Sequence, residues 1–215
     1  MAVQFAEPTG VLGRPQGISP SRWVEEGCFN RSVWSPESLV ADAEPQGFRI
    51  ARQEELPQAH AFCEQLMNMR LAPLWALASA HAHTGASAWV IDRGDGHAAQ
   101  AAQETSGVFL ILPLNWDGEA ALRTERFSFS TPRIDQLCAP GDEIAAMYFW
   151  FCGGADHEAR RSVVHTAMAW IDGSCGDLRV YGRAASEAGA AAFLRLNFRL
   201  LAPKSQNIYF LDKRR

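Results

Sequence analysis

The sequence lacks a hydrophobic run long enough to cross a membrane as a helix. Its strongest apolar stretch, residues 144–152, has the length of a strand, whereas a membrane-spanning helix needs about 20 residues. The N-terminus also lacks the basic start and apolar core of a secretory signal. We therefore expect a cytoplasmic protein that has no membrane partner.

Positive charge is not in excess either, because 20 Lys and Arg residues stand against 24 Asp and Glu residues. Proteins that bind nucleic acids usually carry a basic face that displaces counterions from phosphates. The one basic run, residues 213–215, ends the chain and is typical of a solvated tail. These features predict no nucleic-acid partner.

Cysteine is scarce and its spacing is uninformative, with five residues and no CxxC pair. An odd count without such pairs argues against a disulfide framework and against a zinc site. His81 and His83 lie two residues apart, but no cluster of further ligands follows at metal-binding spacing. We place both histidines in a loop and expect no metal.

Proline divides the chain into two parts. Residues 1–46 hold five of the 11 prolines and show no sustained periodicity, which predicts an irregular arm bearing Trp23 and Trp34. Residues 47–215 read as one domain. An arm with two tryptophans and long apolar strands is compatible with a homodimer.

The domain alternates strand and helix patterns. Expected strands are 48–51, 88–91, 107–114, 144–152, 178–181, 197–201 and 207–211, and a long turn covers 92–105. Expected helices are 56–71, 118–123, 156–171 and 186–196, with Asp156 and Ser186 as N-caps of the last two. Strands mixed with helices in this order predict an α/β fold with a sheet of parallel and antiparallel pairs.

The last third has the order apolar strand, Gly-Gly, amphipathic helix, strand, alanine-rich helix. Residues 186–198 then read SEAGAAAFLRLNF. This part resembles the GNAT acyltransferases (Gcn5-related N-acetyltransferases), in which a helix beginning Asn-x-x-Ala leads through Tyr into Arg/Lys-Leu-Gly-Phe. The resemblance covers residues 47–211 and implies a GNAT-like fold.

The resemblance also implies a site for acetyl-CoA or another acyl-CoA. In this family the pantetheine arm pairs with the free backbone of a strand that splays from its neighbour, and the pyrophosphate binds N–H groups at the next helix start. The matching strand is 144–152. The implied cofactor-binding residues are Phe151, Cys152, Arg160, Arg161, Ser162 and Ser186.

Three positions depart from the family pattern. The family's phosphate loop reads Arg/Gln-x-x-Gly-x-Gly/Ala, and here Val163 and His165 stand where small residues are expected. Bulky side chains there would crowd a pyrophosphate. Phe193 occupies the position of the Tyr that acts as general acid in many members, and a phenyl ring has no proton to give.

Two functions therefore stay open from the sequence. The first is an N-acyltransferase that moves an acyl group from acyl-CoA to a small-molecule or peptide amine, with catalytic residues not assigned. The second is a GNAT-like binding or dimerisation module that has lost acetyl-CoA. A third hypothesis is an unrelated enzyme that uses Cys152 as nucleophile and His157 as base.

Overall fold

The computed structural model describes residues 33–67, 71–92, 105–175, 177–201 and 207–212. The chain divides into two units, Met1–Asn30 and Arg31–Arg215, and all described residues belong to the second. Trp23 and most of the predicted arm, the greater part of the predicted turn at 92–105 and the basic tail lie outside the described residues.

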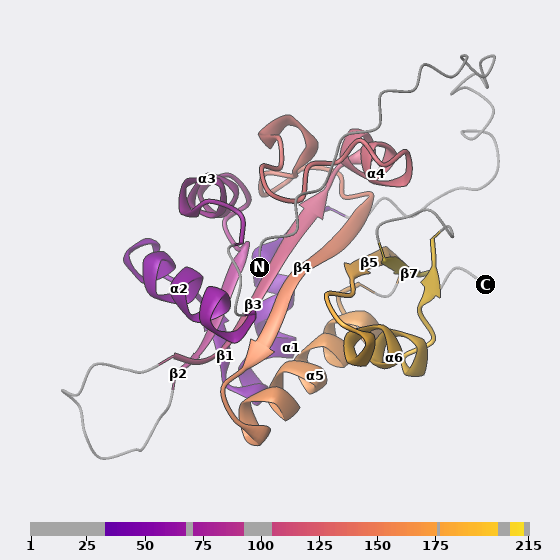
Figure 1. Ribbon diagram of the computed structural model, residues 1–215. Helices are drawn as coiled ribbons and strands as arrows, with labels where there is room; N and C mark the ends of the chain where they lie inside the picture. The colour runs from indigo at the N-terminus through magenta and orange to yellow at the C-terminus, as the bar shows by residue number, and fades with distance from the viewer. Residues whose placement is uncertain (1–32, 68–70, 93–104, 176, 202–206, 213–215) are drawn as a thin grey trace, which may run out of the picture. The chain divides into compact units, whose positions relative to one another are not determined.

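A seven-stranded mixed sheet forms the centre of this unit (Figure 1). Its strands are β1 (Phe48–Ile50), β2 (Ala88–Asp92), β3 (Thr105–Leu114), β4 (Ala146–Gly154), β5 (Arg179–Arg183), β6 (Arg199–Leu200) and β7 (Ile208–Leu211). The order across the sheet is β1-β2-β3-β4-β5-β7-β6. In the described residues, β4 and β5 pair in parallel and the other neighbours are antiparallel. The predicted α/β class with a mixed sheet is confirmed.

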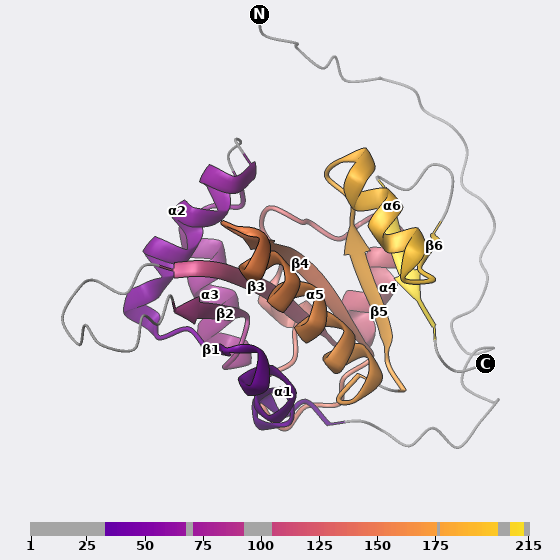
Figure 2. The ribbon, with the colours of Figure 1, turned by 90° about the horizontal axis from the view of Figure 1, so that it is seen from below.

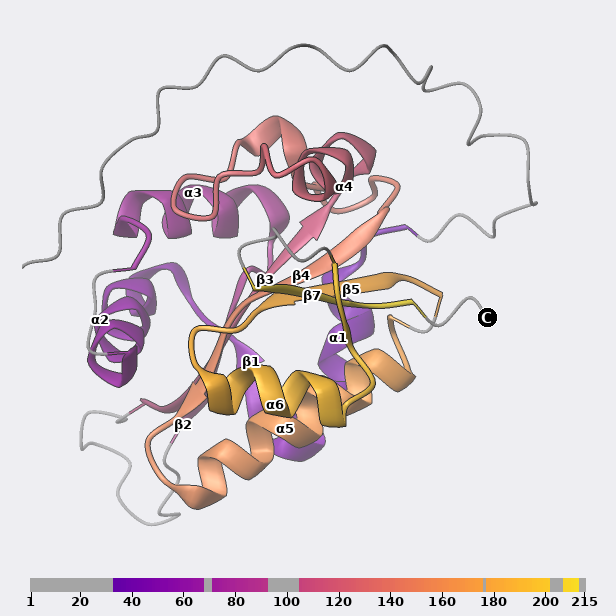
Figure 3. The same ribbon diagram turned by 45° about the vertical axis from the view of Figure 1, so that its right-hand side comes forward.

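Six α-helices cover the two faces of the sheet in the described residues. On one face lie α1 (Pro36–Ala43), α5 (His157–Asp172) and α6 (Glu187–Arg195); on the other lie α2 (Leu56–Met67), α3 (Leu74–Thr84) and α4 (Trp116–Arg123). Figure 2 shows α5 running across β3 and β4 beside α1, and Figure 3 shows α3 and α4 on the opposite side from α5 and α6. Short 3-10 turns occupy Glu44–Gln46, Gln53–Glu55 and Ile134–Gln136.

Aromatic side chains fill the layer beneath α5. Phe109 of β3 contacts both Phe149 of β4 and Trp170 of α5 edge-on, with ring centroids 5.0 and 4.8 Å apart. Trp170 also packs on Trp89 and donates its indole N–H to the carbonyl of Leu39 in α1 at 3.0 Å. Edge-to-face pairs add about 1 kcal/mol each beyond burial, so this cluster fixes α5 and α1 on the sheet.

The predicted irregular arm requires a correction at residues 36–46. Pro36 begins helix α1, because a proline in the first turn loses no intrahelical hydrogen bond. Trp34 is buried and donates its indole N–H to the carbonyl of Thr84 at 2.7 Å. Prolines predict breaks in regular structure, whereas Pro36 starts a helix, and residues 36–46 pack against α5 as part of the domain.

The predicted loop around His81 and His83 is also wrong, because both belong to α3. His81 is buried, and its Nδ1 accepts the backbone N–H of Ala88 at 3.1 Å. Burial lowers the pKa of His81, and a backbone hydrogen bond at Ala51 opposes that shift. His81 therefore joins α3 to strand β2 as a neutral core residue.

Candidate functional site

Strands β4 and β5 stay paired for only part of their length. The parallel ladder runs from Ala146 opposite Arg179 to Phe149 opposite Gly182, after which β4 continues to Gly154. In the described part of the chain, residues 150–154 have no strand partner on the β5 side. We call the point where the two strands part the fork. Beyond it, the backbone of β4 has donors and acceptors that an extended ligand can use.

A β-bulge at Trp150 sets which side chains face each layer. Phe149 pairs with Ile111 of β3 and Phe151 pairs with Leu110, so Trp150 is the extra residue. The bulge turns Phe151 toward the cluster under α2, and Cys152, opposite the buried Phe109, toward the α5 side. The two predicted cofactor residues of β4 therefore lie on opposite faces of the sheet.

Cys152 is exposed, whereas Cys63, Cys138 and Cys175 are buried. Desolvation by neighbouring protein raises the pKa of the Cys152 thiol to about 11. A nucleophilic cysteine needs a lowered pKa. The shift is in the opposite direction, so the thiol is accessible but neutral near pH 7.

The connection from β4 to α5 consists of only Ala155 and Asp156. Asp156 caps the helix as predicted, with its carboxylate accepting the N–H of Ala159 at 2.9 Å. A Cβ on Gly154 would lie 2.6 Å from the backbone nitrogen of Arg160, so Gly154 permits the close approach of strand and helix. The positive end of the α5 dipole therefore already has a carboxylate beside it.

The stretch predicted as a phosphate loop, residues 160–165, lies inside α5. Arg160 donates from Nε to the carbonyl of Gly154 at 3.1 Å, which places its guanidinium beside the end of β4. Arg161 is exposed on the helix, and Ser162 is half-buried. These two belong to the same helix but have no contact with β4 in the described hydrogen bonds and ion pairs.

Val163 and His165 do not stand at the helix start. Val163 is buried in the core beneath α5, and His165 is exposed on its outer side. Their backbone N–H groups lie beyond the first turn of α5, so the predicted crowding of a pyrophosphate by these side chains does not apply. Small residues at the strand-to-helix junction, Gly153 and Gly154, stand there instead.

Ser186 and Phe193 both belong to the α6 layer. Ser186 caps α6 as predicted, accepting the N–H of Gly189 at 3.1 Å. Phe193 is held by Phe198 and Tyr209, whose ring centroids lie 4.9 and 5.3 Å away, and its Cζ end lies against Gly182 of β5. The Phe193 ring thus packs α6 onto β5.

Sequence reasoning missed the residues beside the fork on the α2 side. Trp150 donates its indole N–H to the carbonyl of Phe129 at 2.8 Å. The guanidinium carbon of Arg183, at the end of β5, lies 5.5 Å from the centre of the Phe129 ring. Phe129 comes from an irregular segment far from β4 and β5 in sequence, so only the folded chain joins the three residues.

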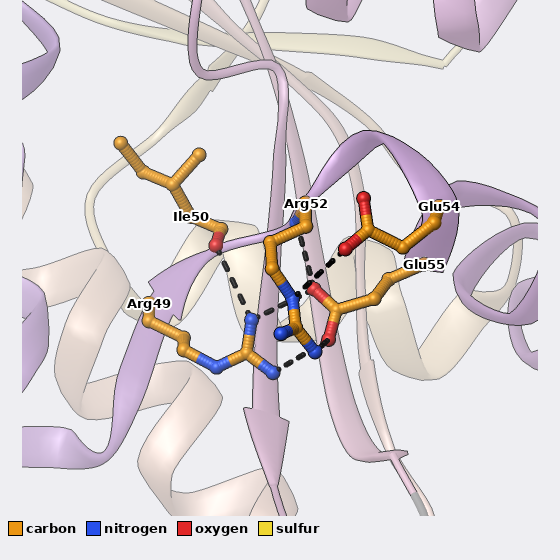
Figure 4. Close-up of polar contacts among 5 residues, drawn as sticks. All are labelled: Arg49, Ile50, Arg52, Glu54 and Glu55. Carbon is orange, nitrogen blue, oxygen red and sulfur yellow. Dashed lines mark hydrogen bonds and ion pairs between the residues drawn. The ribbon is translucent and has the colours of Figure 1, made fainter.

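Two other charged clusters have structural roles. Arg49 binds Glu55 through two hydrogen bonds of 2.8 Å, and Arg52 adds a third of 2.7 Å, which links β1 to the start of α2 (Figure 4). On the α4 side, the buried Glu119 accepts from Arg179 at 2.6 Å and from the Tyr181 hydroxyl at 2.8 Å. In both clusters the carboxylate is satisfied by protein donors.

No family model matches this chain, and no curated protein matches it in sequence. Within the described ranges, no group of three or more His, Cys, Asp or Glu side chains could hold a metal ion. None of the helices described is both long and apolar enough to cross a membrane.

Proposed function

We propose that this chain is a GNAT-like N-acyltransferase that moves an acyl group from an acyl-CoA to an amine. The observation that carries the proposal is the fork, where β4 leaves its parallel partner after Phe149. A free strand backbone that leads directly into the start of a helix is the arrangement that the family uses for the pantetheine arm. The agreement of the strand and helix order along residues 146–211 adds support.

The reaction needs few side chains. The lone pair of a neutral amine attacks the thioester carbonyl carbon, and the carbonyl oxygen takes the negative charge under a backbone N–H of β4 near Phe151. The attack forms the C–N bond; collapse of the tetrahedral intermediate then re-forms the carbonyl, breaks the C–S bond and leaves its electron pair on the CoA sulfur. The amine proton passes to solvent or to that sulfur. No described residue is assigned as the acid or the base.

Direct transfer fits this site better than a covalent acyl-enzyme. Cys152 is the exposed thiol on the free part of β4, and desolvation raises its pKa to about 11. At pH 7 such a thiol is almost entirely protonated and is a poor nucleophile. The raised pKa therefore argues against the nucleophile hypothesis for Cys152.

Calorimetric titration of the full chain with acetyl-CoA and with longer acyl-CoAs tests the proposal. We expect binding that Cys152→Trp abolishes, because the exposed side chain lies on the strand segment that would hold the pantetheine arm. Val164→Trp is the matched control, since Val164 is 48% exposed on the outer side of α5. Absence of binding at millimolar concentration would refute the proposal.

The second candidate is a GNAT-like module that does not use acyl-CoA, and the start of α5 favours it. The carboxylate of Asp156 and the acidic Glu158 of the first turn stand where a pyrophosphate would bind. Phe193 has no proton for a leaving thiolate and is packed against Gly182. This candidate predicts that neither acetyl-CoA nor a longer acyl-CoA binds. Replacing Val163 by glycine should then lower the stability of the core without creating a site for acyl-CoA.

A further inference from the structure

The fork has a distinct chemical character on the α2 side of the sheet. Trp150 and Arg183 are the first residues beyond the paired part of β4 and β5, and Phe129 touches both. Tyr181 faces the α4 side and Gly182 faces α6, so alternation along β5 turns Arg183 to the same side as Trp150. One cation and two aromatic rings therefore flank the point where transfer would occur.

Arg183 is directed toward this point. Its guanidinium carbon lies 5.5 Å from the centre of the Phe129 ring, and that ring lies 5.4 Å from the ring of Tyr148; in agreement, the charge of Arg183 opposes the rise that burial causes in the pKa of Tyr148. Tyr148 precedes the fork on β4, opposite Tyr181. Cation–π contact with Phe129 then holds the guanidinium at the fork.

The guanidinium is available to a ligand. Among the described residues, no carboxylate lies within ion-pair distance of Arg183, whereas Arg49, Arg52, Arg133 and Arg179 each have at least one. A guanidinium held by the face of a ring keeps its N–H edges free to donate. A single guanidinium matches a carboxylate through two parallel hydrogen bonds.

We propose that Arg183 binds the carboxylate of the acceptor, and that the acceptor is an amino acid whose apolar side chain packs on Trp150 and Phe129. This inference rests on the proposed function and names its substrate class. The carboxylate orients the molecule so that its amine points to the thioester at the fork. The aromatic rings select an apolar or aromatic side chain over a charged one.

Binding to the full chain without acyl-CoA tests the inference separately from the transfer reaction. The probes are L-phenylalanine, L-phenylalaninamide and 2-phenylethylamine, compared by calorimetry or ligand-observed NMR at a pH where all three amines are charged. We expect L-phenylalanine to bind about 10- to 100-fold more tightly than the other two. The Arg183→Gln variant should lose this preference, and Arg183→Lys should retain part of it.

Arg199→Gln is the matched control, because Arg199 is an exposed arginine on β6. It should leave the preference for the carboxylate unchanged. Circular dichroism and thermal melting should show that both glutamine variants are folded, since both side chains are exposed.

Each outcome decides the matter. Equal binding of the three probes, no binding of any of them at millimolar concentration, or a preference that persists in Arg183→Gln would overturn the inference. If acyl-CoAs do not bind but the carboxylate preference depends on Arg183, the transfer function fails and the carboxylate site stands. If acyl-CoAs bind and amines are acylated without that preference, the transfer function stands and the assignment of Arg183 fails.

Discussion

The packing of α6 on β5 can be tested by adding one methyl group at Gly182 of β5. A Cβ on Gly182 would lie 2.4 Å from Cζ and 2.7 Å from Cε1 of Phe193, whereas ordinary contact begins at 3.4 Å. In Gly182→Ala the ring must retreat by roughly 1 Å. Phe198 and the stacked Tyr209 limit this movement, because their rings already contact Phe193.

The expected cost follows from two opposing effects. Overpacking of this size costs about 1–3 kcal/mol, while replacing glycine by alanine in an extended strand returns about 0.4–1 kcal/mol through the unfolded chain. We expect Gly182→Ala to lower the free energy of unfolding by about 1–2 kcal/mol. In a Phe193→Leu background, where the ring is gone, the same substitution should be near neutral, which gives a coupling of about 1–2 kcal/mol.

Urea unfolding followed by circular dichroism measures all four corners of this cycle. Gly189→Ala in α6 is the matched control, because its Cβ would meet nothing closer than 3.4 Å and alanine favours a helix. A Gly182→Ala protein as stable as the wild type, or a cost that is the same with Leu at position 193, would refute the packing of α6 on β5. It would also remove the structural explanation for phenylalanine at this position.

Three further predictions concern the site and the charged cluster at β1. In the folded Cys28→Ser protein, the rate at which the Cys152 thiol reacts with iodoacetamide should rise with pH toward its pKa of about 11. A fast reaction whose rate levels off near pH 7 would contradict the raised pKa. Asp156→Asn keeps an N-cap and removes a charge, so acetyl-CoA affinity measured by calorimetry should rise about two- to fivefold, with Asp117→Asn at the start of α4 as an unaffected control. The pKa of Glu55 is lowered by its hydrogen bond with Arg49, so its contribution to folding is present above the unfolded pKa of about 4.3 and is lost as the pH falls below it. Glu55→Gln should therefore cost about 1 kcal/mol in urea unfolding at pH 7, and the difference from wild type should shrink below pH 4; a constant difference would contradict the ion-pair assignment.

The parts of the fold that the sequence predicted are those with a local cause. The apolar runs marked β3 and β4, and the caps at Asp156 and Ser186 marked two helix starts, because each signal lies in the segment that it organises. The prediction at Pro36 fails for a local reason too, since proline can either end a helix or begin one, and the distinction depends on the residues that follow.

The site was less predictable, because its residues meet only through tertiary structure. The family pattern placed a phosphate loop at residues 160–165, which lie inside the helix that the sequence also predicted, and the structure buries Val163 of that stretch in the core. Arg183 belongs to no sequence motif. Only the structure shows that it lies where β5 leaves β4 and that it contacts Phe129, which comes more than 50 positions earlier. Hydrophobic periodicity along the sequence cannot predict contacts between residues so far apart in the chain.

The bulge at Trp150 has a consequence for the tolerance of β4 to changes in length. It inserts one extra residue between two halves of the strand, so deleting Trp150 would restore regular alternation and leave Phe151 toward α2 and Cys152 toward α5. Such a deletion should thus keep the lining of both faces beyond the fork and lose only the Trp150 side chain. For the same reason, a correct alignment of this strand with a straight one requires a gap at position 150. A comparison without that gap would assign the role of every residue from 151 to 154 to its neighbour.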